Sequence, residues 1–582
     1  MKSKFFLLSI ILFSIFIFSS TMLIAQTCLC TSADDDITIA GGWPKTFVNS
    51  AGDDVIWDVE PIDVNEDGTT DGYIVAGSVD AGGSEGKNIY VRRLNANGTE
   101  YTGGSWPINE DGQNNVDAAY AVEITPDKKI LVCGSKRTSH FNLLGIKNKN
   151  AWVMKYNLDG TNATGWPSGG IEYGGDGDDE AYDIKAVSSN SYIVAGMAGL
   201  GTDDVPTNAQ GDGDYWVFNI NGTGTIITGR NKVYFGTNSN EGNDYARSIA
   251  IDCNTGKYVI SGFCKSCAPE GDDHSQLLLL KIPANFGTED SELYGYDGEN
   301  LDDYGSYQVI QTQQTLGDCT VGDGFLSIGL QHPNPGCYGG NHDFWAVNTQ
   351  DDLSEDTNFN DECVNANAGQ AYGGKKKDNG HSVVQICDGY LLAGITESNN
   401  KKLSCDLCQV SCNHYDCTDI VTEDIWLAKI SGTGELVWNE SIGTSGNDGA
   451  YVLKYVEGDS YIVAGYTTSS NGDKDWYLVK FSIPDCSERL TAEDHPTNQL
   501  STNPNPSTGS FSVALQLSDK INESVWLQIL DVAGKEISAH EAMISDGSLQ
   551  QQILSNELQS GFYLARIVIN HKVYQSKIII QN

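Results

Sequence analysis

A short apolar phrase that ends in glycine occurs seven times along the chain, and it limits the fold more than any other feature. The copies begin at residues 73, 130, 192, 258, 325, 390 and 461 and read YIVAG, ILVCG, YIVAG, YVISG, FLSIG, YLLAG and YIVAG. A period of roughly 57 to 71 residues indicates seven structural units that stack on their neighbours.

Each unit also carries an acid-led turn before the phrase, with the pattern Asp-x-small-x-x-apolar. The acid stands 12 to 14 residues before the phrase in five copies, and 19 and 22 residues before it in the first and fifth. The acids are Asp54, Asp117, Asp179, Asp244, Asp303, Asp378 and Asp448. The first copy has Ile56 in place of the small residue, and the fifth is one residue longer. The acids could line one rim of the assembly. A repeated residue usually serves the repeat, so we expect each to accept hydrogen bonds from backbone amides of its own turn.

A loop, an aromatic-rich strand, a glycine turn and a weaker strand follow each phrase, so every unit holds four short strands. Four strands per unit are typical of a propeller blade, in which neighbouring blades cover both faces of each sheet. The sequence predicts an all-β fold, a closed seven-bladed β-propeller followed by a small β-sandwich. An open array, or two smaller sheets, is the alternative. Five tryptophans recur at one strand position and are expected in the core: Trp152, Trp216, Trp345, Trp426 and Trp476.

The predicted domains follow from the ends of this array. Residues 1–25 read as a signal peptide, because Lys2 and Lys4 precede an apolar run and a cleavage site after Ala25. Residues 26–490 form the propeller, and the seventh unit lacks its fourth strand. We expect residues 37–47 to supply that strand and close the ring. Residues 491–502 form a linker, and residues 503–582 alternate with a period near two, as strands of a sandwich do.

The C-terminal segment resembles the sorting domain of type IX secretion cargo. The residues that carry the resemblance are Asn503, Pro504, Asn505, Pro506, Gly509, Asp531, Gly534, Lys535, Gly561, Phe562, Tyr563 and Lys577. The resemblance implies export across the outer membrane of a Gram-negative bacterium, with the type IX machinery as partner. It implies a protein that is secreted or attached to the cell surface. The repeats themselves loosely resemble those of secreted bacterial propellers of the FG-GAP type.

The charge balance narrows the partners. The chain has 78 acidic and 35 basic residues, for a net charge of −43. Such a chain repels nucleic acid and attracts cations, so no nucleic-acid partner is expected. After the signal, no segment is apolar enough to cross a membrane, so the mature chain is predicted to lack a transmembrane span.

The stretch DVNEDGTTDGY, residues 63–73, places oxygen ligands at alternate positions around a glycine. The predicted ligands are Asp63, Asn65, Asp67, the Thr69 carbonyl and Asp71. Calcium prefers six to eight such oxygens. Ile74 stands where a helix-loop-helix site has its glutamate, so the loop resembles instead the calcium hairpins of FG-GAP-type propellers. The sequence predicts a structural Ca²⁺ here, and an acidic turn held by its own hydrogen bonds is the alternative.

All 15 cysteines follow the signal, and in an oxidising compartment most should pair. The disulfide candidates are Cys264, Cys267, Cys319, Cys337, Cys363, Cys387, Cys405, Cys408, Cys412 and Cys417. The last four, with His414, could bind zinc instead. Loops stapled on a rigid scaffold often carry recognition, so these loops are the predicted binding surface.

No catalytic residues are assigned, and the sequence favours a non-catalytic binding or adhesion role with a glycan or protein ligand. A secreted hydrolase or lyase, with acids at the propeller channel, is the alternative, and a structural surface protein is a third. Acids and a basic residue converging at one channel mouth would favour the enzyme. A flat, loop-built face with aromatic residues would favour binding.

Overall fold

The structure is a computed structural model, and it describes residues 37–483 and 499–580 apart from short gaps. The gaps are 50–51, 66, 81, 83–85, 111–116, 142–146, 210–212, 235–242, 268–274, 296–304, 314–321, 332–341, 357–358, 360–368, 375, 399–421, 504–509, 518–522, 532–534, 546–547, 555–557, 559–560 and 570–571. The predicted signal peptide lies outside the described residues. Within them, no helix is long and apolar enough to cross a membrane.

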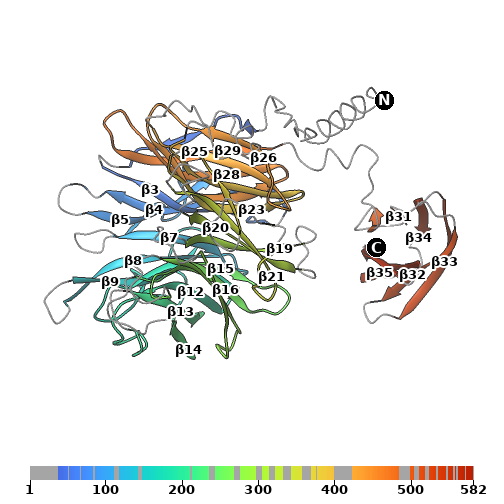
Figure 1. Cartoon of the computed structure of the whole chain (residues 1–582), viewed down its shortest axis with the longest axis horizontal. Helices are drawn as coiled ribbons and strands as arrows, with labels where there is room; N and C mark the ends of the chain where they lie inside the picture. The colour runs from blue at the N-terminus through green and yellow to red at the C-terminus, as the bar shows by residue number, and fades with distance from the viewer. Residues whose placement is uncertain are drawn as a thin grey trace, which may run out of the picture. The chain divides into compact units, whose positions relative to one another are not determined.

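The described residues form 36 β-strands and no helix, which confirms the prediction of an all-β chain. Two compact units divide the chain after Ile483. The first unit holds seven antiparallel sheets, and the second holds two (Figure 1).

Six sheets of the first unit each take four consecutive strands. The first sheet consists of β3 (Val55–Ile62), β4 (Gly72–Asp80), β5 (Lys87–Asn95) and β6 (Ile108–Glu110). The second consists of β7 (Ala118–Ile124), β8 (Lys129–Phe141), β9 (Lys147–Asn157) and β10 (Ile171–Tyr173). The third consists of β11 (Glu180–Ser188), β12 (Ser191–Ala198), β13 (Asp214–Asn221) and β14 (Ile226–Tyr234). The fourth sheet consists of β15 (Tyr245–Ile251), β16 (Tyr258–Cys264), β17 (Gln276–Ile282) and β18 (Asp290–Tyr294). The fifth consists of β19 (Gly305–Gln313), β20 (Gly322–Gln331), β21 (Asp343–Gln350) and β22 (Gln370–Tyr372). The sixth consists of β23 (Asp378–Ile386), β24 (Gly389–Thr396), β25 (Asp424–Ser431) and β26 (Leu436–Ile442).

The seventh sheet joins the two ends of the first unit. Its strands are β27 (Asp448–Glu457), β28 (Ser460–Thr468) and β29 (Lys474–Ser482), together with β1 (Thr38–Ile39) and β2 (Lys45–Phe47). Both N-terminal strands pair antiparallel with β29, so that Ile39 lies opposite Phe481 and Thr46 opposite Tyr477. The last sheet therefore takes its outer strands from the start of the chain.

The first strands of the sheets contact one another in chain order. The contacting pairs are β3–β7, β7–β11, β11–β15, β15–β19, β19–β23, β23–β27 and β27–β3. The first sheet (blue) thus lies beside the last (orange), as Figure 1 shows. The order of contacts returns to the sheet at which it began.

Side chains on five first strands hydrogen-bond to the next sheet. The carboxylate of Asp183 on β11 accepts a hydrogen bond of 2.8 Å from the backbone N–H of Ile249 on β15. Ser382 on β23 likewise accepts one of 2.9 Å from Leu453 N–H on β27. The same contact joins Asp58 to Val122, Ser248 to Val309 and Gln308 to Val383. These bonds fix the register between neighbouring sheets.

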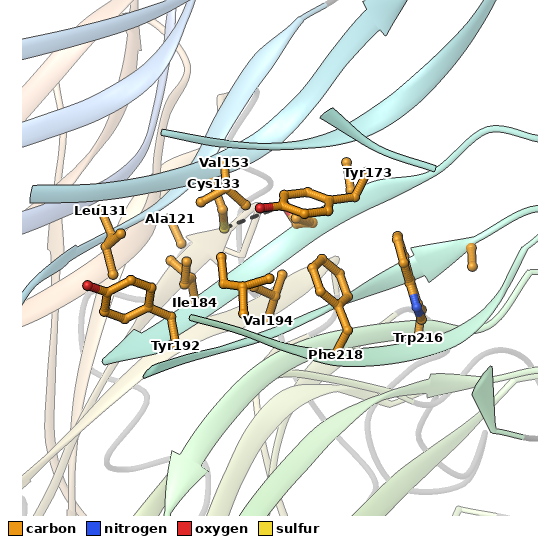
Figure 2. Packing of buried hydrophobic residues seen from close by; sticks show 14 of the residues in the cluster. Ala121, Leu131, Cys133, Val153, Tyr173, Ile184, Tyr192, Val194, Trp216 and Phe218 are labelled. Carbon is orange, nitrogen blue, oxygen red and sulfur yellow. Dashed lines mark hydrogen bonds between the residues drawn. The ribbon is translucent and has the colours of Figure 1, made fainter. Parts of the chain in front are cut away.

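Apolar side chains fill the space between the sheets. Figure 2 shows one such cluster, in which Leu131 and Val153 of the second sheet pack on Val194 and Phe218 of the third. The five recurring tryptophans are fully buried, as predicted: Trp152, Trp216, Trp345, Trp426 and Trp476.

Six of the seven repeated acids are described, and all six are fully buried, namely Asp54, Asp117, Asp179, Asp244, Asp378 and Asp448. Asp179 shows the arrangement: one oxygen accepts from Gly175 N–H of its own turn at 2.8 Å, and the other accepts from Gly199 N–H at 2.8 Å. Gly199 follows the second strand of the sheet, so the acid holds two loops together and not only its own turn. Asp303 lies outside the described residues.

The second unit consists of a three-stranded and a four-stranded sheet. The strands are β30 (Gln499–Asn503), β31 (Ser510–Gln516) and β34 (Ser548–Leu554) in the first, and β32 (Glu523–Asp531), β33 (Glu536–Ile544), β35 (Gly561–Ile569) and β36 (Lys572–Ile580) in the second. One buried cluster takes side chains from both sheets, among them Phe511, Leu527 and Ile567.

Candidate functional site

A β-bulge interrupts the first strand of all seven sheets at the same place. In the third sheet Ala181 pairs with Gly196 and Asp183 with Ala195, which leaves Tyr182 without a partner on β12. The corresponding residues of the seven sheets are Trp57, Tyr120, Tyr182, Arg247, Tyr307, His381 and Tyr451, and we call them the collar. A bulge re-aims a side chain, so each sheet directs one large residue away from its own ladder.

Five members of the collar contact one another through their rings. The ring centroid of Trp57 lies 5.6 Å from that of Tyr120 and 4.5 Å from that of Tyr451. Tyr120 lies 5.3 Å from Tyr182, and His381 lies 4.9 Å from Tyr451. The first, second, third, sixth and seventh sheets thus meet through aromatic pairs.

The remaining two members continue this chain of contacts. The ring centroid of Tyr307 lies 4.4 Å from that of His381. The guanidinium carbon of Arg247 lies 3.9 Å from the ring centroid of Tyr182, a cation–π distance.

Two cavities share all seven collar residues. The first, of about 680 Å³, is lined beyond the collar by residues before the bulge, such as Glu180 and Asn379. The second, of about 440 Å³, is lined by residues after the bulge, such as Asp183 and Lys454. The collar therefore lies between the two cavities. Residues from all seven sheets line the first cavity.

The first cavity gathers both signs of charge around the aromatic collar. Its basic lining residues are Arg247, Lys377 and Lys474, and its acidic ones are Asp178, Glu180, Glu397 and Glu423. Glu180 is already ion-paired, since Lys149 Nζ lies 3.1 Å from its carboxylate. The cavity is thus richer in cations than the chain as a whole, in which acids outnumber bases by 78 to 35.

One corner of this cavity is a hydrogen-bonded cluster. The hydroxyl of Tyr466 donates to the carboxylate of Glu423, and Lys474 Nζ lies 3.7 Å from the centroid of the Tyr466 ring. Burial raises the pKa of Tyr466, and the bond to Glu423 raises it further. Burial lowers the pKa of Lys474, against the attraction of Glu423. The tyrosine therefore acts as a neutral hydrogen-bonding group near pH 7.

His381 is also held neutral. Burial lowers its pKa to about 3, and the positive charges of Arg247 and Lys377 act in the same direction. Its ring lies between those of Tyr307 and Tyr451. At neutral pH it is therefore an uncharged flat ring, like its neighbours in the collar.

The second cavity contains two lysines that are both ion-paired. Lys454 Nζ lies 2.7 Å from Glu60 and 3.4 Å from Asp58. Lys185 Nζ lies 3.3 Å from Glu123 and 3.4 Å from Asp183. Burial would lower the pKa of each lysine, but the carboxylates outweigh it, so both pKa values are raised. This side of the collar is a satisfied charge network, which suits a structural role.

A third cavity, of about 520 Å³, adjoins the collar at Arg247 and Tyr307 and reaches Lys265. Lys265 belongs to a loop that the disulfide Cys264–Cys267 closes. Its backbone N–H donates 2.6 Å to Asp244, one of the repeated acids. A stapled loop therefore does border the collar, although the collar lies on strands.

The other cysteine predictions fall mostly outside the described residues. Cys319, Cys337, Cys363, Cys405, Cys408, Cys412 and Cys417 all lie there, as does His414. Cys387 and Cys253 are disulfide-bonded, and Cys133 is a buried free thiol. The zinc alternative for the last cysteine cluster stays a prediction.

The predicted calcium ligands lie on an exposed hairpin between β3 and β4. Their carboxylates accept hydrogen bonds from backbone N–H groups of the same loop. Asp63 accepts one of 2.9 Å from Gly68, Asp67 one of 2.8 Å from Thr69, and Asp71 one of 2.7 Å from Val64. The side-chain amide of Asn65 donates 3.1 Å to Asp67. The hydrogen bonds from Thr69 lower the pKa of Asp67. Among the described residues, no three His, Cys, Asp or Glu side chains lie close enough to hold a metal ion.

The sorting residues are spread over the second unit. Asn503 ends β30, Asp531 ends β32, and Lys535 lies just before β33. Gly561, Phe562 and Tyr563 open β35, and the exposed Lys577 on β36 pairs with Leu564. Pro504, Asn505, Pro506, Gly509 and Gly534 lie outside the described residues.

The sequence contained a signal for the collar that its interpretation missed. The residue three positions after the repeated acid is Trp, Tyr, Tyr, Arg, His or Tyr in six copies, and Tyr307 follows four positions after the acid in the longer fifth copy. The pattern Asp-x-small-x-x-apolar left this position undefined. A large residue at a fixed place in every repeat was the available clue.

The comparisons with known proteins address mainly the second unit. Residues 501–581 match the family model of the secretion system C-terminal sorting domain. This match confirms the predicted resemblance of that segment and implies involvement of the type IX machinery. It is consistent with secretion or a place on the outer cell surface.

Part of the chain is similar to a solved structure. This is a crystal structure of a protein of unknown function from Dyadobacter fermentans DSM 18053, at 12% identity and a TM-score of 0.30. The similarity covers 63% of this chain and 95% of that one. No curated protein matches the chain.

Proposed function

We propose that residues 26–490 form a closed seven-bladed β-propeller, which binds a ligand without chemical change in the first cavity at one end of its channel. Two features support the closed ring: the contact order returns from β27 to β3, and β1 and β2 complete the last sheet. A closed ring has no open sheet edge to protect. The space between the first strands is then the channel, and the collar crosses it.

The collar is the observation that carries the binding role. In each of the seven sheets, one bulge directs a large side chain toward the two cavities that the collar borders. Aromatic faces beside a few charged groups are the usual lining of a ligand pocket. We therefore place the ligand in the first cavity, bordered by the Cys264–Cys267 loop, and not on stapled loops alone.

A hydrolase or lyase is the second candidate, because acids and bases converge in the first cavity. General acid–base catalysts work best with a pKa near the operating pH. His381 has a pKa of about 3, and burial raises the pKa values of Tyr120, Tyr182, Tyr451 and Tyr466. At His381 and these tyrosines the shifts favour hydrogen bonding and packing over proton transfer, so binding ranks first. The lowered pKa of Lys474 is the shift that keeps the enzyme as the second candidate.

The sorting domain supports delivery to the cell exterior. We propose that residues 1–25 are removed as a signal peptide and that residues 503–582 guide the chain through the type IX machinery. The propeller then acts as a secreted or surface-attached binding protein, with a glycan or protein as ligand. Residues 491–502 would link the two units.

The test is a binding screen on the mature full chain. We would apply it to a glycan array and to a panel of glycoside and peptide substrates. Binding without turnover, lost in Trp57→Ala but kept in Trp526→Ala, is the expected result. Trp526 is a matched control, because it is 61% exposed and lies in the sorting unit. Turnover would favour the enzyme, and neither binding nor turnover would favour a structural surface protein.

A further inference from the structure

Arg247 is the only cationic member of the collar at neutral pH, and it is held between two aromatic faces. Its guanidinium carbon lies 3.9 Å from the ring centroid of Tyr182 and 4.8 Å from that of Tyr245. The residue lines all three cavities described above. Its position is therefore fixed by packing, and its side chain borders the space that a ligand would occupy.

In the part of the chain that the structure describes, no carboxylate forms an ion pair with the guanidinium, and Glu180 acts on its pKa only at longer range. Its Nε is buried and has no hydrogen-bond partner. Arg92 and Arg93 of the first sheet also have a buried Nε without a hydrogen-bond partner. Each of them has another polar partner, because Arg92 lies 3.0 Å from Glu100 and Arg93 donates a hydrogen bond of 2.7 Å to the carbonyl of Leu158. An arginine whose Nε is buried and unpaired carries a desolvation cost, and a ligand anion bound to the guanidinium would offset that cost.

The surroundings of Arg247 indicate what else the ligand carries. The cavity offers flat rings from the collar, which suit the face of a sugar ring. It also offers carboxylates such as Asp178 and Glu397, which accept hydrogen bonds from hydroxyl groups. The cavity therefore suits a ligand that carries several hydroxyl groups and one carboxylate, and an acidic saccharide fits this description better than an acidic peptide.

We propose that Arg247 binds the carboxylate of an acidic saccharide, such as a uronate, in the first cavity. This proposal rests on the proposed function and deepens it. The planar guanidinium can hold both carboxylate oxygens at once, which an ammonium group cannot do. Tyr182 and Tyr245 would keep the guanidinium oriented, and the collar rings would stack on the sugar.

The experiment is a calorimetric titration of the mature full chain with three probes. They are a trimer of galacturonic acid, its methyl ester, and a tripeptide of glutamate. The ester keeps the rings and hydroxyls and replaces each charged carboxylate by a neutral methyl ester. The variants are Arg247→Gln and Arg247→Lys, with Arg230→Gln as control, since Arg230 contacts Asn219 and lies outside the three cavities.

We expect the acid trimer to bind roughly 10- to 100-fold more tightly than its ester, as a charge-assisted hydrogen-bonded pair provides. Arg247→Gln should remove that preference, Arg247→Lys should restore it in part, and Arg230→Gln should leave it unchanged. Equal affinity for acid and ester, or a preference that survives in Arg247→Gln, would overturn the proposal.

Two other outcomes would also contradict it. Tighter binding of the glutamate peptide than of the trimer would exclude the saccharide class. No binding of any acid at millimolar concentration would exclude an anion site at Arg247. The proposed function is tested separately. If the array identifies a neutral ligand whose binding is lost in Trp57→Ala, the proposed function stands whether or not Arg247 binds an acid.

Discussion

At the scale of single residues, the collar uses aromatic and cationic side chains in states that do not change near neutral pH. His381 shows how this is done, because its ring packs between Tyr307 and Tyr451 beside Arg247. A charged imidazole there would face a guanidinium in a partly buried space. The fold therefore favours the neutral ring, so the folded state takes up a proton at His381 less readily than the unfolded chain does.

This leads to a pH-dependent stability difference between the parent and His381→Phe. The folded-state pKa of His381 is about 3, below its ordinary value of 6.5. Below pH 6.5 the unfolded chain takes up a proton that the folded chain does not, so the parent loses stability as pH falls. The melting temperature of His381→Phe, relative to the parent, should rise from pH 7.5 to pH 4.5. A difference that stays constant over this range would show that the imidazole titrates normally.

The calcium hairpin gives a second prediction at this scale. The predicted oxygens of Asp63, Asp67 and Asp71 lie on one exposed loop, where a cation would offset their repulsion. EDTA should lower the melting temperature of the mature chain, and added calcium should restore it. Asp67→Ala should lose this response. Asp127→Ala, in the corresponding hairpin of the second sheet, is the control and should keep the response. Equal responses of the two variants would show that the loop is an acidic turn without calcium.

At the scale of elements, the repeated glycine and the bulge explain each other. In the third sheet Gly196 lies opposite Ala181, the residue before the bulge. A Cβ on Gly196 would lie 1.9 Å from the carbonyl oxygen of Glu180. The seven glycines that end the apolar phrase all meet such a carbonyl within 2.1 Å: Gly77, Gly134, Gly196, Gly262, Gly329, Gly394 and Gly465. The glycine thus makes room for the bulge that positions the collar.

A single added methyl group should therefore be costly at this place. Gly196→Ala should destabilise the first unit by about 1–3 kcal/mol or more, because the backbone of β11 must move. Gly432→Ala is the control, since nothing lies within 4 Å of its added Cβ. Urea denaturation of both variants measures the difference. Similar midpoints for the two would mean that the bulge tolerates a side chain on the neighbouring strand.

The elements also show what could be predicted from the sequence and what could not. Apolar alternation and turn residues were enough to predict the strands, the buried tryptophans such as Trp152 and the acid in each turn. The side-chain direction at Tyr182 could not be derived from alternation, because a bulge shifts the two-residue period by one. The second partner of Asp179, Gly199, is 20 residues away in sequence, so a local reading of the turn did not include it.

At the scale of the whole molecule, the first unit depends on its N-terminal strands. β1 and β2 pair with β29, which would otherwise present an unpaired edge. A mature chain that lacks residues 26–49 should melt at a lower temperature and self-associate through this edge. A chain that lacks only residues 26–36, which precede β1, should behave as the parent does. Size-exclusion chromatography with light scattering measures the association, and a stable monomer without residues 26–49 would contradict the closed ring.

Binding in the first cavity is the central claim, and Tyr451 and Tyr455 test it on one strand. Both lie on β27, but Tyr451 belongs to the collar, whereas Tyr455 is 51% exposed outside the three cavities. The measurement is the dissociation constant of the array-identified ligand for Tyr451→Ala and Tyr455→Ala in the mature chain. Tyr451→Ala should bind at least about tenfold more weakly than the parent, and Tyr455→Ala should bind equally well. Unchanged affinity in Tyr451→Ala, with its fold intact, would place the ligand elsewhere and contradict the account.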